Sequence, residues 1–94
     1  MLSLPQRVTH ALANNCLAAL SAQVPQAPQR VALDAQHLQE FDSSVLAVVL
    51  ELRRVCLGLN KELVLTDAPE RLLALARLYG VHALLVPAAA AQAP

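Results

Sequence analysis

Hydrophobic and polar positions along this chain change period several times, which predicts alternating strands and helices. Apolar residues recur at helical spacing over residues 7–23, with polar side chains at the positions between them. Short apolar runs over 30–34 and 62–66 predict strands. Two further helices are predicted, one over 44–57 and one over 70–79.

The two ends of the chain give shorter signals. Residues 1–4 are apolar and predict a short edge strand that Pro5 ends. Residues 82–86 form another short apolar run, which predicts a last strand. From Pro87 onward the chain is rich in alanine, so we expect one domain over 1–86 followed by a flexible tail over 87–94.

Glycine and proline mark the expected element boundaries. Gly58 and Gly80 lie where the second and third helices should end. Pro25 and Pro28 keep the segment after the first helix out of helical conformation. An Asp or Thr shortly before Pro69 is expected to cap the third helix, since proline is favoured at the first helical position.

The order of these elements predicts the fold class. Strands that alternate with helices indicate parallel pairing through right-handed crossovers. We therefore expect a small α/β fold with about four mainly parallel strands and three main helices. Its core must be aliphatic, because 56% of the residues are hydrophobic but only 2% are aromatic.

Charge and hydropathy exclude two classes of partner. Seven basic side chains balance seven acidic ones, whereas nucleic-acid binding depends on clustered basic groups. No apolar run approaches the roughly 20 residues that span a bilayer, so no direct membrane insertion is expected. Low charge and high apolarity together favour a protein that spends its time bound to a partner.

Residues with catalytic chemistry are few and scattered. Cys16 and Cys56 form no CxxC pair, which favours reduced thiols in a cytoplasmic protein. His10, His37 and His82 stand singly, without metal-ligand spacing. The two glycines cannot build a phosphate-binding loop. We therefore expect no metal, no cofactor and no enzymatic activity.

The segment Asp42-Ser43-Ser44 is the leading functional candidate. Asp and Ser before an apolar helix predict capping of its free N–H groups. A serine hydroxyl at an exposed helix start can also be phosphorylated, and the new charge would change what docks there. The two interpretations are compatible.

Two helices carry more apolar surface than a single stripe. Two explanations fit the surplus apolar residues of the helix over 44–57. The helix either packs deeply between the sheet and its neighbours or uses the additional apolar surface to contact a partner. In the helix over 70–79, Leu73 and Leu78 fall partly outside the core stripe. That predicted stripe consists of Leu72, Leu75, Ala76 and Tyr79.

Three segments together resemble the STAS domain. The strand Val31-Ala32-Leu33-Asp34 and the helix start Phe41-Asp42-Ser43-Ser44-Val45 resemble the strand, loop and D-[ST]-[SAG]-G-L pattern of that family. The segment 73–81 (LALARLYGV) resembles the corresponding helix of MlaB-like STAS proteins. The similarity extends from about Ser3 to Val86.

This resemblance implies a non-enzymatic subunit. MlaB-like proteins are cytoplasmic STAS subunits of Mla phospholipid-transporting ABC complexes, which maintain lipid asymmetry, and they bind the ATPase subunit. The chain would then lie at the inner membrane's cytoplasmic face through its partner. The contact residues that the resemblance implies are Asp42, Ser43, Ser44, Ala47, Arg54, Arg71 and Tyr79.

An alternative function follows from related anti-sigma-factor antagonists, in which the first hydroxyl residue after the Asp is phosphorylated. That residue is Ser43 here. Val45 replaces the usual glycine, and a β-branched side chain there would restrict kinase access. STAS domains usually open with two strands, and this chain has room for only the end of the second. The truncated hairpin is expected to leave a sheet edge that a second copy could pair with in a homodimer.

Overall fold

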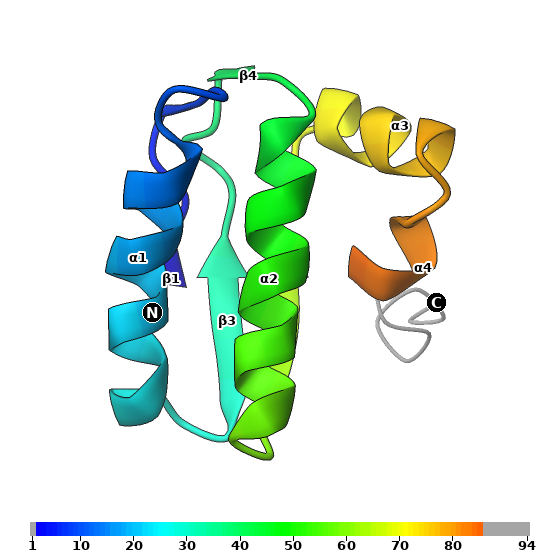
Figure 1. Cartoon of the computed structure of the whole chain (residues 1–94). Coiled ribbons are helices and arrows are strands. Elements are labelled where there is room, and N and C mark those ends of the chain that lie inside the picture. Colours follow the sequence, from blue (N-terminus) through cyan, green and yellow to red (C-terminus); the bar gives the residue numbers. More distant parts are fainter. Residues whose placement is uncertain (1, 86–94) are drawn as a thin grey trace.

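The structure, a computed structural model, describes residues 2–85 (Figure 1). Strands and helices alternate along this part of the chain, which confirms the predicted α/β class. The elements in order are β1 (Leu2–Ser3), β2 (Arg7–Val8), α1 (Ala13–Gln23), the 3₁₀ turn η1 (Val24–Gln26), β3 (Arg30–Asp34), β4 (Glu40–Phe41), α2 (Ser44–Gly58), β5 (Glu62–Thr66), α3 (Glu70–Leu78) and α4 (His82–Leu85).

The central sheet is parallel, with the strand order β1-β3-β5. β5 pairs with β3 along its whole length, from Arg30 opposite Glu62 to Asp34 opposite Thr66. β1 pairs with β3 at Leu33 and Asp34. Neighbouring parallel strands need a crossover, and α1 and α2 supply the two crossovers. A separate parallel pair, β2 with β4, lies at the top of Figure 1.

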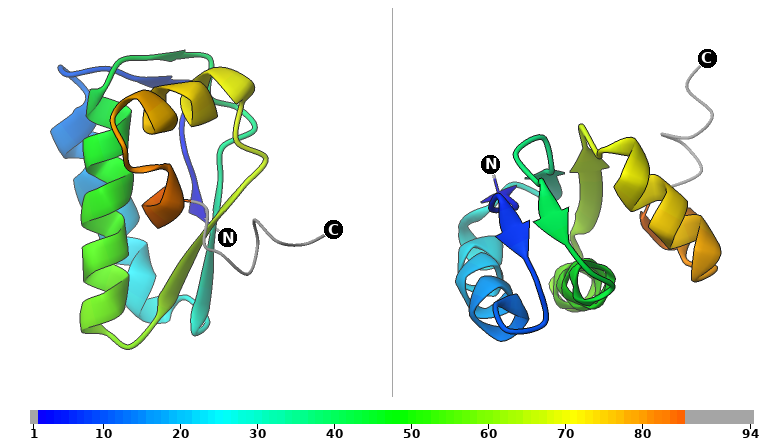
Figure 2. Two further views of the ribbon diagram at one scale, coloured as in Figure 1. Left: turned by 90° about the vertical axis from the view of Figure 1, so that its right-hand side faces the viewer. Right: turned by 90° about the horizontal axis from the view of Figure 1, so that it is seen from above.

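Both crossover helices cover the same face of the sheet, as the right-hand view of Figure 2 shows. Side chains alternate between the two faces of a strand, so Val31 and Leu33 point into the core under the helices. The opposite face carries the ion pair between Arg30 Nε and Glu62 Oε1 at 3.0 Å. α3 lies beyond the β5 side of the sheet.

Packing on several sides explains the apolar sequence of α2. The helix contacts α1, β5 and α4. Six of its residues are buried: Val45, Leu46, Val48, Val49, Leu52 and Cys56. Deep packing therefore accounts for most of the apolar surface of α2, and of its large apolar residues Leu57 alone stays exposed, near the far end.

The first predicted helix is shorter than expected. It begins at Ala13, and the segment Arg7–Val8 forms strand β2 instead. Arg7 Nη2 lies 3.2 Å from Glu40 Oε2 on the paired strand β4. This pairing joins segments more than 30 positions apart, so helical periodicity around residue 7 could not reveal it.

The prediction of a strand over 82–86 is wrong for its described part, because His82–Leu85 forms the one-turn helix α4. The N–H of Leu84 donates to the carbonyl of Val81 at 3.0 Å, which closes that turn. A short apolar run fits a buried helix turn as well as a strand. Val86 and the predicted tail lie outside the described residues.

Helix ends follow the predicted signals in part. Gly80 has φ 73°, which confirms the left-handed stop after α3. After α2 the left-handed residue is Asn60, at φ 59°, and Gly58 is the last helical residue. α3 begins behind Pro69 with no side-chain cap, so the predicted Asp or Thr cap is wrong. Among residues 2–85, no helix has the length and apolarity to cross a bilayer.

Lys61 closes the end of the molecule opposite β4. Its Nζ donates to the carbonyl oxygens of Val24 and Ala27, each at 2.7 Å, and of Pro25 at 3.2 Å. Helix ends leave carbonyl groups unpaired, and a cation there is favourable. Lys61 thus ties the segment after α1 to the start of β5.

We expect Lys61→Met to lower the free energy of unfolding by about 2 kcal/mol, because it removes charge-assisted hydrogen bonds to three carbonyl groups. Urea unfolding would measure the loss. Arg54→Met is the matched control: its exposed ion pair with Glu51 contributes about 0.5 kcal/mol or less. Equal losses in the free energy of unfolding of the two variants would show that the hydrogen bonds of Lys61 do not stabilise the fold more than an exposed ion pair does.

Candidate functional site

A groove of about 590 Å³ lies between the start of α2 and α3. Parallel pairing places the ends of β4 and the beginnings of α2 and α3 at the same end of the fold (Figure 1). The groove is lined by Phe41, Asp42, Ser43, Arg71, Ala74, Leu75, Leu78 and Tyr79. It therefore brings together four of the seven predicted contact residues.

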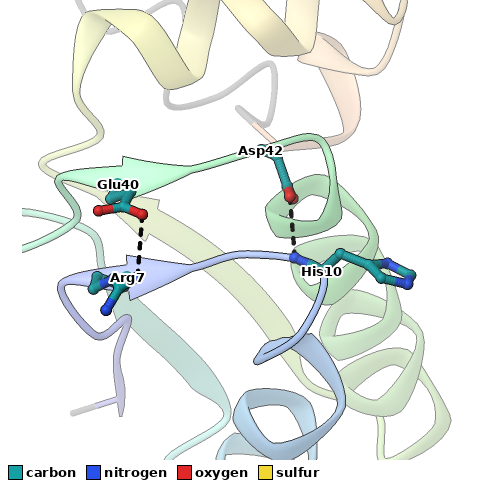
Figure 3. Close-up of polar contacts among 4 residues, drawn as sticks. All are labelled: Arg7, His10, Glu40 and Asp42. Atoms are coloured by element: carbon teal, nitrogen blue, oxygen red, sulfur yellow. Dashed lines mark hydrogen bonds and ion pairs between the residues drawn. The ribbon is translucent and has the colours of Figure 1, made fainter.

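Asp42 ties two segments together with its carboxylate. Oδ1 accepts the N–H of Ser44 at 2.8 Å. Oδ2 accepts the N–H of His10 at 3.0 Å, and Figure 3 shows this second contact. These backbone hydrogen bonds, that of Ser44 first, lower the pKa of Asp42 from its ordinary value. The predicted capping is confirmed for Asp42, whereas Ser43 makes no side-chain cap bond. Asp42 positions the groove wall, because both of its oxygens are engaged.

The pair of strands β2 and β4 supports this tie. Arg7 bonds Glu40 across the pair, as Figure 3 shows. Gln6 Nε2 also donates to Gln39 Oε1 at 2.9 Å. The segment that leads into α2 is thus fixed immediately before Asp42, so Ser43 follows at a defined position.

Ser43 is exposed at the groove, and Val45 is fully buried. The Val45 side chain therefore belongs to the core and does not close the surface beside the Ser43 hydroxyl. The steric argument against kinase access, which relied on Val45, loses its basis.

Arg71 brings a positive charge to the groove. Its guanidinium carbon lies 5.0 Å from the centre of the Phe41 ring, a cation–π arrangement that holds the side chain over β4. Its Nη1 is 3.5 Å from the carbonyl oxygen of Gln39. Arg71 has no carboxylate partner among residues 2–85. The charge is available to an acidic group of a partner.

The apolar rim of the groove comes from the end of α3. Leu78 is 80% exposed and Tyr79 is 57% exposed. Leu72 and Ala76 are buried as predicted, but Tyr79 is not part of the core stripe. Tyr79 follows the last residue of the helix, so helical spacing no longer sets its direction. Leu78 was not predicted as a site residue, although its place outside the stripe was the signal.

The other three predicted contact residues do not line the groove. Ser44 is half-buried at the first position of α2, and Ala47 is exposed one turn further along. Arg54 lies in the second half of α2, with its Nη1 3.1 Å from Glu51 Oε1. Sequence reasoning also missed Phe41, Ala74 and Leu75, which the fold brings to the site.

The two thiols do not form a reactive site. Cys16 and Cys56 are free, and burial raises the pKa of both. A raised pKa favours the thiol over the nucleophilic thiolate. Among the described residues, no three His, Cys, Asp or Glu side chains cluster in a way that could hold a metal ion.

Comparison with protein families identifies the chain. The family model described as "Mlab, STAS domain" matches residues 1–87. The chain belongs to this MlaB-like STAS family. The comparisons with curated proteins and with solved structures find no match. The family match confirms the resemblance that the Asp-Ser-Ser helix start and the segment 73–81 carried.

We expect Asp42→Asn to destabilise the fold in a pH-dependent way. The folded pKa of Asp42 is depressed, so its carboxylate stabilises the fold above the ordinary pKa, and this contribution is lost as the pH falls through the folded value. The difference in unfolding midpoint between wild type and variant should therefore be full near pH 6 and shrink below about pH 4. Denaturant titrations at several pH values would measure it. A difference independent of pH would contradict the role assigned to the carboxylate.

Proposed function

We propose that this chain is a non-enzymatic STAS subunit that binds the ATPase subunit of an ABC-type phospholipid transporter and so contributes to lipid asymmetry. It would lie at the cytoplasmic face of the inner membrane through that partner. The observation that carries the proposal is the groove, where exposed Leu78 and Tyr79 lie with Arg71, which has no carboxylate partner among residues 2–85. Membership of the MlaB-like family supports the class of partner.

The chemistry of the groove suits a protein partner. Interfaces combine an apolar centre with a polar rim, and Tyr and Arg are enriched among the residues that contribute most affinity. Leu75, Leu78 and Tyr79 supply the apolar part, and Arg71 supplies a charge. The partner would insert an apolar side chain and place a carboxylate against the guanidinium.

A binding role also fits the ionisable groups of the groove. The carboxylate of Asp42 is engaged by two backbone N–H groups. The groove lining contains no histidine, and its one carboxylate, that of Asp42, is already engaged, so no lining residue is free to act as a base for Ser43. Nucleophilic catalysis needs such a pair within hydrogen-bond distance, so the arrangement supports recognition over catalysis.

We expect Tyr79→Ala and Ser43→Arg each to weaken association with the cognate ATPase subunit at least about tenfold. The first removes an exposed aromatic contact, and the second places a bulky charge on the groove wall. Neither residue is buried, so the fold should persist. Co-purification and titration of the two subunits would measure the effect.

Arg54→Ala is the matched control, because Arg54 is exposed on α2 but outside the groove. It should bind the ATPase subunit as wild type does. Failure of the wild-type chain to associate, together with unchanged phospholipid transport in the Ser43→Arg and Tyr79→Ala variants, would refute the proposal.

A phospho-switch of the anti-sigma-antagonist type is the second candidate. The observation that favours it is the open surface at Ser43, whose neighbour Val45 is in the core. Arg71 lines the same groove and could pair with a phosphate group on Ser43.

This alternative predicts that a partner kinase adds one phosphate, which Ser43→Ala abolishes while Ser44→Ala retains it. Intact-mass measurement after incubation with candidate kinases would decide. If no phosphorylated form of the wild-type chain accumulates, the phospho-switch is wrong and the groove serves binding alone.

A further inference from the structure

The outer edge of β5 is a second surface, separate from the groove. Glu62 donates its N–H to Gln29, and Thr66 accepts from the N–H of Ala35, each at 2.9 Å, so these residues bond toward β3. In a parallel ladder, alternate residues of a strand direct their backbone N–H and C=O groups to opposite sides. Leu63 and Leu65 therefore point their N–H and C=O groups outward. Figure 2, left, looks onto this edge, and no described strand covers it.

Among residues 2–85, the β5 strand carries none of the sequence features that usually protect an edge against strand addition. Such features are Lys, Pro, bulges or inward-pointing charges on the edge strand. The centre of β5 is Leu63, Val64 and Leu65, and its one charge, Glu62, already pairs with Arg30. The described part of the chain therefore leaves the β5 edge suited to receive an extended chain.

A small apolar hollow of about 190 Å³ opens beside the same edge. It is bounded by α2, by the start of β5 and by α4, through Arg53, Leu57, Glu62, Leu63, Ala83 and Leu84. Leu57 is 53% exposed and Leu84 is 44% exposed. One apolar side chain of an added strand would cover both.

Arg53 adds charge selectivity to the hollow. It has no carboxylate partner among the described residues, whereas its neighbour Arg54 pairs with Glu51 at 3.1 Å. Glu62, the other charge at the hollow, is neutralised by Arg30. The net charge offered to a partner here is positive.

We propose that the β5 edge binds an extended peptide segment of a partner protein by strand addition. The peptide pairs with the outward groups of Leu63 and Leu65, places a branched apolar side chain in the hollow beside Leu57, and sets a carboxylate against Arg53. Strand addition of this kind takes affinity from backbone hydrogen bonds and specificity from alternate side chains.

The position of α4 favours a lone peptide over a second copy. α4 lies beside β5 on the helix-covered face, next to α2 (Figure 2). A second copy that paired antiparallel through its own β5 would bring its α2 into the layer that α4 occupies. A single strand needs no space in that layer.

The test uses the full chain and a capped peptide of alternating Thr and Val with one Leu and, two positions away, one Glu, so that both side chains point to the face that carries the hollow. NMR titration should shift the amide signals of Leu63 and Leu65, and peptide binding should slow their hydrogen exchange. Arg53→Glu should weaken binding at least about fivefold, and Arg54→Glu should not. A control peptide with Lys for Glu and Gly for Leu should bind more weakly to the wild-type chain.

Four results would overturn the proposal. Exchange of the Leu63 and Leu65 amides as slow as that of Leu33 in the free chain would show an edge covered by the chain itself. Protection that rises with protein concentration would identify a second copy as the occupant. Peptide-induced shifts at Leu78 and Tyr79 in place of Leu63 and Leu65 would move the binding site to the groove. Finally, the absence of saturable binding at millimolar peptide would exclude this chemistry.

Discussion

The full-length parallel ladder between β3 and β5 is the constraint from which the rest of the structure follows. Parallel neighbours cannot be joined by a tight turn, so the chain must return across the sheet as α2. That return buries α2 between the sheet, α1 and α4, and it carries the helix start to the end of the molecule where the strands finish. α3 begins at the same end after β5. The parallel topology therefore places the groove between α2 and α3, and the few side chains that line it determine its chemistry.

Arginine side chains differ in whether they have a carboxylate partner within the described part of the chain, and this difference marks the surfaces suited to bind a partner. Four arginines are satisfied by nearby glutamates, at 3.0 to 3.4 Å. Arg71 and Arg53 are not so paired among residues 2–85, and each stands beside exposed leucine side chains, one in the groove and one at the β5 edge. A surface that combines unpaired charge with exposed apolar area is costly for an isolated domain and favourable in a complex. The zero formal charge of the chain hides this uneven distribution.

Local signals predicted the elements whose causes are local. The apolar run over 44–57, the strand patterns over 30–34 and 62–66, and the left-handed stop at Gly80 all appear in the structure. The pairing of Arg7–Val8 with Glu40–Phe41 could not be predicted from the sequence, because each two-residue strand is too short to show a hydrophobic period of its own. The candidate groove was predictable only in part. The helix start at Asp42 and Ser43 and the family resemblance pointed to four of its residues, whereas Leu78 gave only the weaker signal of a leucine outside the predicted core stripe.

Lys61 has a practical consequence for work on complexes of this protein. It is the chain's single lysine, and its ammonium group is held by three carbonyl oxygens. Amine-directed reagents must break those contacts to react there. Lysine-directed cross-linking would therefore report little about the groove or the β5 edge. Carboxylate-directed or photoreactive cross-linkers are the appropriate tools for mapping what this domain binds.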